Sequence, residues 1–129
     1  AAVADRLETG GRSVVYCPDN ELGSEEDLHR TDFGRKLMEF IADADLLFHD
    51  ARYLDEDMPE FKGRGHSCPG DAARLAASAG VRKLILFHAD ARYSRERLEA
   101  AAAGLRDSLR KRGESLAVEW PQAGARYSL

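Results

Sequence analysis

The amino-acid sequence predicts an α/β fold in which a β-hairpin precedes alternating helices and strands. Two short apolar segments, residues 46–48 (LLF) and 83–87 (KLILF), have the length of strands and show no alternation of polar and apolar residues. Strands of this kind are buried on both faces, as in sheets whose parallel strands are joined by helices. Segments with apolar residues at helical spacing follow each of them. The predicted order is therefore hairpin, α, β, α, β, α, β, forming a mixed sheet.

The hairpin is predicted from residues 2–8 and 12–17, which flank Gly10-Gly11. Two glycines between strand-like segments suit a two-residue hairpin turn. Pro18-Asp19-Asn20 ends the second strand, because proline has no N–H for the ladder. Ser24, followed by three acidic residues, has the pattern of a helix N-cap.

The later elements follow from apolar spacing and from the residues that start and stop helices. One helix is predicted from a stripe formed by Leu37, Phe40, Ile41 and Ala44. A second helix begins at Pro69 and ends at Gly80, and a third follows Ser94 and stops at Gly113. Residues 115–120 are predicted to close the chain as a last strand.

Composition limits the classes of protein to which the chain can belong. Its 129 residues are enough for one domain with a buried core, and 43% hydrophobic with 33% charged residues is ordinary for a soluble protein. A net charge of −4 gives no strong nucleic-acid signal, and no apolar run reaches the length of a membrane span. Two cysteines without C-x-x-C spacing favour a reducing, cytoplasmic location. The chain opens without methionine, so we expect it to be part of something longer.

Polar residues suited to metal or proton chemistry stand at the ends of the predicted strands. They are Asp19, His49-Asp50 and His88, with His66 just before a helix. Ligands of open α/β sheets gather at this edge, and carboxylate with imidazole suits a divalent metal. Taken singly, an Asp after a strand is more often a turn former, and a histidine there is more often structural.

Two other residues are weaker candidates. His29 lies between Leu28 and Arg30 and is expected to face solvent. Cys68 stands near a helix start, where a thiol can become reactive, but no base is placed beside it in the sequence. A Cys-His nucleophile is therefore not favoured.

The order of these residues resembles a known family. The segments are VVYCPDNE (14–21), DLLFHDARY (45–53) and GRGHSCPGDAARLAASAGVRKLILFHADARYS (63–94). Together they resemble the C-terminal half of the metallo-β-lactamase superfamily, most closely the branch of ribonuclease Z and phosphodiesterase-like hydrolases. The resemblance implies half of a four-layer αββα sandwich, in which two sheets pack face to face between outer helices.

The resemblance also implies roles for individual residues. Asp19 matches an aspartate that bridges two metal ions, usually zinc, and His88 matches the last histidine ligand. Asp50, beside a supporting His49, matches an acidic residue that orients a metal-binding histidine. His66 matches a histidine that protonates the leaving group or holds the scissile phosphate. Manganese or iron could replace zinc, since Asp and His serve all three metals.

Several features depart from the family. Its H-x-H-x-D-H loop is missing from this sequence, and Asp19 and His88 are two ligands where a metal needs about four. We therefore expect residues 1–129 to be a C-terminal half whose metal site is incomplete and which is inactive alone. Arg64 stands where the family often has an aromatic residue, Cys68 where it has threonine, and Asp5 where it has glycine.

These features leave three functional hypotheses and one structural expectation. The first hypothesis is a metal-dependent hydrolase that acts on a phosphodiester or related ester, or another small-molecule substrate. The second is a non-catalytic half-domain used in assembly or regulation, and the third is an unrelated flavodoxin-like or receiver-type domain. The inner sheet face is expected to be covered by the missing N-terminal half or by a second copy of the chain.

Overall fold

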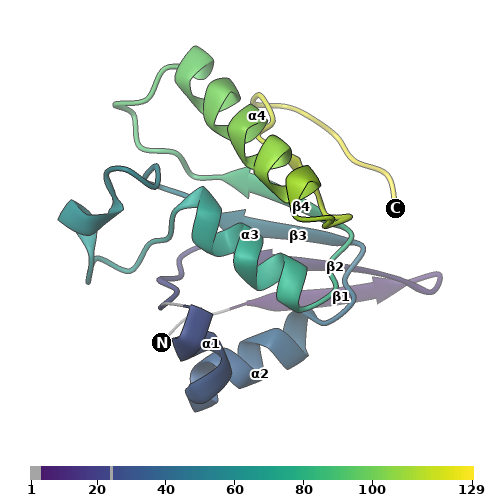
Figure 1. Ribbon diagram of the computed structural model, residues 1–129. Helices are drawn as coiled ribbons and strands as arrows, with labels where there is room; N and C mark the ends of the chain where they lie inside the picture. Colours follow the sequence, from purple (N-terminus) through teal and green to yellow (C-terminus); the bar gives the residue numbers. More distant parts are fainter. Residues whose placement is uncertain (1–3, 24) are drawn as a thin grey trace.

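A computed structural model describes residues 4–23 and 25–129, which form a mixed five-stranded sheet with helices packed against it (Figure 1). The strands are β1 (Asp5–Thr9), β2 (Arg12–Cys17), β3 (Leu46–Asp50), β4 (Lys83–Phe87) and β5 (Ala117–Glu119). The helices are α1 (Glu25–Arg30), α2 (Asp32–Ile41), α3 (Pro69–Ser78) and α4 (Arg95–Lys111), with a 3-10 turn η1 (Met58–Phe61). Among the described residues, no helix has the length and apolar character needed to cross a membrane.

The strands lie in sequence order, β1-β2-β3-β4-β5. The first pair is antiparallel, and β2 to β5 are parallel. Gly10 and Gly11 form the hairpin turn with φ of 57° and 77°, a conformation that glycine adopts without a steric penalty. The predicted α/β class, with a hairpin before alternating elements, is confirmed.

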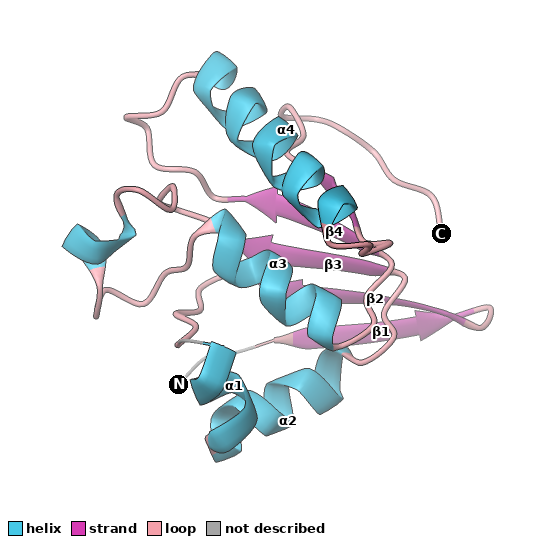
Figure 2. Ribbon diagram, in the orientation of Figure 1, coloured by secondary structure: helices cyan, strands magenta, loops and turns pink. Residues whose placement is uncertain are grey.

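The two faces of the sheet are covered differently. On one face, Val15, Leu47, Leu84 and Val118 belong to a core cluster that buried residues of the helices complete. Helices α3 and α4 lie in front of the sheet in Figure 2. The opposite face carries the alternate residues of the same strands, and its central members Leu46 and Ile85 are also buried. The prediction that β3 and β4 are buried on both sides is therefore confirmed.

A segment from the chain terminus covers part of this second face. The ring of Tyr127 meets Phe48 edge-on, with centroids 6.0 Å apart. Farther out, towards β1, the face is bare: Tyr16 is 45% exposed and Leu7 is 64% exposed. Large apolar side chains with this exposure mark a surface that another layer can cover.

Some element boundaries differ from the predicted ones. Helix α2 ends at Ile41, and Asp43 then adopts φ of 57°, so Ala44 lies outside the helix although it is buried. The last strand is shorter than the predicted 115–120 and spans only Ala117–Glu119, the residues that pair with β4. The predicted N-cap at Ser24, and residues 2–3 of the predicted first strand, lie outside the described residues.

Candidate metal centre

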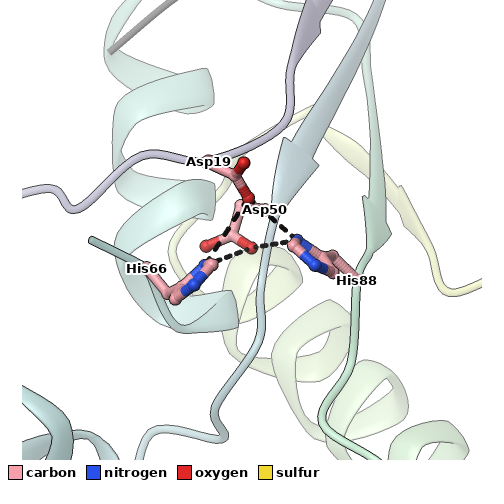
Figure 3. Close-up of side chains that lie close together, drawn as sticks. All are labelled: Asp19, Asp50, His66 and His88. Atoms are coloured by element: carbon pink, nitrogen blue, oxygen red, sulfur yellow. Dashed lines mark hydrogen bonds and ion pairs between the residues drawn. The ribbon is translucent and has the colours of Figure 1, made fainter. Parts of the chain in front are cut away.

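Four polar side chains come together where the parallel strands reach their carboxyl ends (Figure 3). Asp19 follows β2, Asp50 ends β3 and His88 follows β4, while His66 lies in the loop before α3. One potential ligand atom from each residue lies within 4.8 Å of the others. Neighbouring parallel strands end at the same sheet edge, so the fold brings residues far apart in sequence into one cluster.

Asp50 lies at the centre of the cluster and is fully buried. Its Oδ1 accepts hydrogen bonds from Nδ1 of His66 at 3.2 Å and Nδ1 of His88 at 3.1 Å. Its Oδ2 accepts the backbone N–H of Ser67 at 2.7 Å. Burial raises the pKa of Asp50, while the Ser67 N–H and the imidazoles oppose that rise. Asp50 therefore holds the Nδ1 side of both imidazole rings towards the centre of the cluster.

Asp19 borders the cluster on its solvent side. Its Oδ1 lies 3.2 Å from Nδ1 of His88 and 3.8 Å from Nδ1 of His66, and its side chain is 66% exposed. The cluster therefore has one buried carboxylate and one accessible carboxylate, with the two imidazoles between them. Its open side faces solvent at Asp19.

The backbone of His88 adopts an unusual conformation that contributes to this arrangement. Its φ of 71° lies in the left-handed region, which costs a non-glycine residue about 1–2 kcal/mol. Hydrogen bonds hold the chain on both sides: Ala51 N–H donates to Phe87 O, and Asp90 N–H donates to Arg52 O, each at 3.0 Å. The surrounding loops thus stabilise a conformation that the residue itself disfavours.

His49 lies outside the cluster, on the opposite face of β3 from Asp50. Its Nδ1–H donates to the Asp50 carbonyl at 2.8 Å, so Nε2 is the acceptor for the Asn20 side-chain amide at 3.3 Å. Burial lowers the pKa of His49 to about 4, outweighing the bond to the Asp50 carbonyl, which raises it. His49 is therefore neutral near pH 7, and it connects β3 to the segment that carries Asp19.

Asn20 and Ser67 are two buried residues that the sequence did not single out. The Ser67 hydroxyl donates to the Asn20 carbonyl and accepts the backbone N–H of Leu22 at 3.1 Å. These bonds join the segment after β2 to the segment that carries His66. Each residue is adjacent to a predicted site residue, but small polar residues are common in loops, so adjacency alone was no signal.

The remaining candidates lie away from the chemistry. His29 is exposed on α1, as expected. Cys68 is a buried free thiol, and burial together with Asp55 and Asp71 raises its pKa far above the usual range. The thiol is therefore protonated at neutral pH and is a poor nucleophile.

The donors in the cluster fit a divalent metal. Two carboxylates and two imidazoles are the ligand types of zinc, and manganese and iron also accept them. The Asp50–imidazole hydrogen bonds match the carboxylate–histidine pairs that orient metal ligands.

Comparison with known proteins gives consistent matches to one superfamily. Residues 2–89 match the family model described as "Beta-lactamase superfamily domain". The sequence is 40% identical to ribonuclease Z of Haloferax volcanii over 84 residues. The aligned region is 65% of this chain and 23% of that protein. Over 95 residues, 74% of this chain, it is 37% identical to ribonuclease Z of Bradyrhizobium diazoefficiens, covering 28% of that protein. The chain thus spans about a quarter of the length of these curated relatives.

Solved structures show the same fold. The metallo-beta-lactamase fold protein YhfI from Bacillus subtilis aligns with a TM-score of 0.67 and 23% sequence identity. The alignment covers 95% of this chain and 41% of the YhfI chain. Human tRNase Z, short form, aligns with a TM-score of 0.54 and 26% identity over 69% of this chain and 31% of its own. The predicted resemblance, including its ribonuclease Z branch, is confirmed.

Proposed function

Because the chain belongs to the beta-lactamase superfamily, we propose that it is the C-terminal portion of a metal-dependent hydrolase of phosphodiester or related ester bonds. The observation that carries this proposal is the convergence of Asp19, Asp50, His66 and His88 at one sheet edge. The relatives are ribonucleases by name, which favours an RNA phosphodiester as the substrate.

Each residue of the cluster has a role that its position supports. Asp19 and His88 would hold metal, with two zinc ions in a complete site and manganese or iron as alternatives. A divalent metal bound there lowers the pKa of a water molecule and neutralises charge on a phosphoryl group. Asp50 would fix both imidazoles through their Nδ1 atoms, and His66 would give a proton to the leaving-group oxygen. His49 would support the site by holding Asn20.

Residues 1–129 would be one half of the complete domain. The H-x-H-x-D-H loop, which supplies further metal ligands in the family, does not occur in this sequence. The bare part of the second sheet face, around Leu7 and Tyr16, would be covered by the N-terminal half or by a second copy of this chain. On this proposal the chain alone has no hydrolase activity.

A non-catalytic half-domain, used in assembly or regulation, is the second candidate. The absence of the H-x-H-x-D-H motif from the 129 residues favours it. The nucleotide sequence upstream of Ala1 separates the two candidates, because an in-frame H-x-H-x-D-H makes the chain part of an enzyme. A start codon next to Ala1 supports the half-domain.

Zinc titration by calorimetry tests the metal site directly. We expect weak, saturable binding to the chain, because it supplies only part of the ligand set. His88→Ala should remove that binding, while His29→Ala, a matched change at an exposed histidine on α1, should not. Tight binding, or equal binding by His88→Ala, would contradict the proposed ligands. In a complete active protein, Asp19→Ala should abolish turnover.

A further inference from the structure

A pair of stacked aromatic rings lies beside the candidate metal cluster, in the segment between β3 and α3. The backbone of this segment is at the left of Figure 1. Tyr53 and Phe61 stack with centroids 4.1 Å apart and an interplanar angle of 5°. The Tyr53 ring meets the His66 imidazole edge-on at 6.1 Å. Tyr53 is buried and Phe61, at the end of η1, is half-buried, so the outer ring is the accessible one.

Arg64 lies against the outer ring. Its guanidinium carbon is 5.2 Å from the Phe61 centroid, within the range of a cation–π contact. Gly63 and Gly65 flank it with φ of 85° and 83°, and their backbone N–H groups donate to the Glu21 carboxylate at 2.8 and 2.9 Å. Glu21 comes two residues after Asp19, so the turn that carries Arg64 is tied to a segment of the metal cluster.

In the part of the chain that the structure describes, the Arg64 guanidinium itself has no acidic partner, because the nearby Glu21 carboxylate accepts from the backbone N–H groups of Gly63 and Gly65 instead. Within residues 4–23 and 25–129, no carboxylate forms an ion pair with it. Two other arginines near the rings differ, because Arg52 and Arg92 both pair with Asp90, at 3.3 and 3.1 Å. The Arg64 guanidinium therefore has N–H donors available for an external anion, while the ring and the clamped turn limit its freedom.

We propose, on the basis of the proposed hydrolase function, that Arg64 binds a phosphate adjacent to the scissile linkage and thereby selects a polynucleotide substrate. The planar guanidinium fork matches two phosphate oxygens at once. A polynucleotide carries phosphates on both sides of an internal linkage, whereas a neutral ester or lactam offers no such charge. The net charge of −4 belongs to the whole chain and does not exclude a single phosphate contact at Arg64.

Fluorescence anisotropy with a short fluorescein-labelled oligouridylate tests the proposal on the full chain. The buffer contains EDTA, so binding is measured without metal and without turnover. We expect Arg64→Gln to weaken binding about tenfold and to reduce the slope of log affinity against log salt by about one. Arg64→Lys, which keeps the charge but loses the fork, should keep the slope and bind with intermediate affinity.

Arg110→Gln is the matched control, since this arginine is exposed on α4 and pairs with Asp107. It should bind as the unsubstituted chain does. No saturable binding by the unsubstituted chain, an unchanged affinity in Arg64→Gln, or an equal loss in Arg110→Gln would each overturn the proposal. Failure of the zinc titration alone would instead count against the hydrolase function, so the two failures are distinguishable.

Discussion

Asp50 and His88 stand at the ends of neighbouring strands and share a hydrogen bond of 3.1 Å between Oδ1 and Nδ1. The same oxygen binds His66, so one buried carboxylate sets the orientation of both imidazoles in the cluster. Hydrogen bonds of this kind fix the tautomer of a histidine and raise its basicity as a metal ligand.

Asp50→Asn should lower zinc affinity about ten- to a hundredfold, because an amide cannot accept from both Nδ1–H groups and Ser67 N–H as a carboxylate does. The measurement is calorimetric zinc titration of the chain. Asp107→Asn, the same chemical change on exposed α4, serves as control and should bind zinc normally. Unaltered affinity in Asp50→Asn would show that the histidines do not depend on this carboxylate.

His49→Gln should flatten the dependence of stability on pH. The pKa of His49 is lowered from 6.5 to about 4 in the folded state, so its contribution is fully present above pH 6.5 and is lost as pH falls towards 4. As the pH falls through this window, His49 takes up a proton in the unfolded chain but stays neutral in the folded chain. This difference lowers the free energy of unfolding by about 3 kcal/mol once the pH has reached 4. Glutamine retains hydrogen-bonding groups but does not titrate there.

Urea unfolding across this pH window measures the difference. His29→Gln, at an exposed histidine, should keep the pH dependence of the unsubstituted chain. If His49→Gln and His29→Gln give the same curve, His49 is not the group that destabilises the fold in acid.

Ser67→Ala should reduce the free energy of unfolding by about 1–3 kcal/mol. It removes the hydroxyl that pairs with Leu22 N–H and the Asn20 carbonyl and leaves both of these buried groups without that partner. Urea denaturation gives the value. Ser78→Ala, at an exposed position that ends α3, should change it by less than about 0.5 kcal/mol. Equal effects of the two substitutions would argue against the buried network.

Tyr16→Glu should reduce self-association of the isolated chain. Tyr16 is 45% exposed on the second sheet face and stacks on Phe87 at 5.5 Å, so a charge there disfavours burial against another layer. Sedimentation velocity should show concentration-dependent association of the unsubstituted chain and a monomer for Tyr16→Glu. Phe33→Glu, equally exposed but on α2, should leave association intact. A well-folded monomer of the unsubstituted chain would contradict the uncovered-face proposal.

Local patterns were sufficient to predict most of the fold. The Gly10-Gly11 turn and the apolar runs of β3 and β4 each depend on neighbouring residues, and each lies where it was predicted. The end of α2 was missed because Ala44 continues the apolar spacing, although the backbone turns at Asp43. The ends of the last strand are set by which residues pair with β4. The local sequence of residues 115–120 does not carry that information, so the strand was predicted too long.

The sequence indicated which four residues would lie close together, but it did not indicate their contacts. Residues at strand ends, with the family resemblance, suggested Asp19, Asp50, His66 and His88. One oxygen of Asp50 contacts both histidines because of the paths of the loops and the left-handed backbone of His88. Neither of these features has a recognisable sequence pattern. The separation of His49 from Asp50 does follow from strand alternation, once the register is known.

The pairing of β3 with β4 places Asp50 opposite Phe87 and His49 opposite Leu86. Sliding β3 by a single position would exchange the sides of its last two residues, sending the acid into the helix-packed interior and the neutral imidazole towards the ligands. Insertions inside this strand should consequently be far more damaging than insertions of equal length in the loop that follows it, even where both leave the apolar core intact.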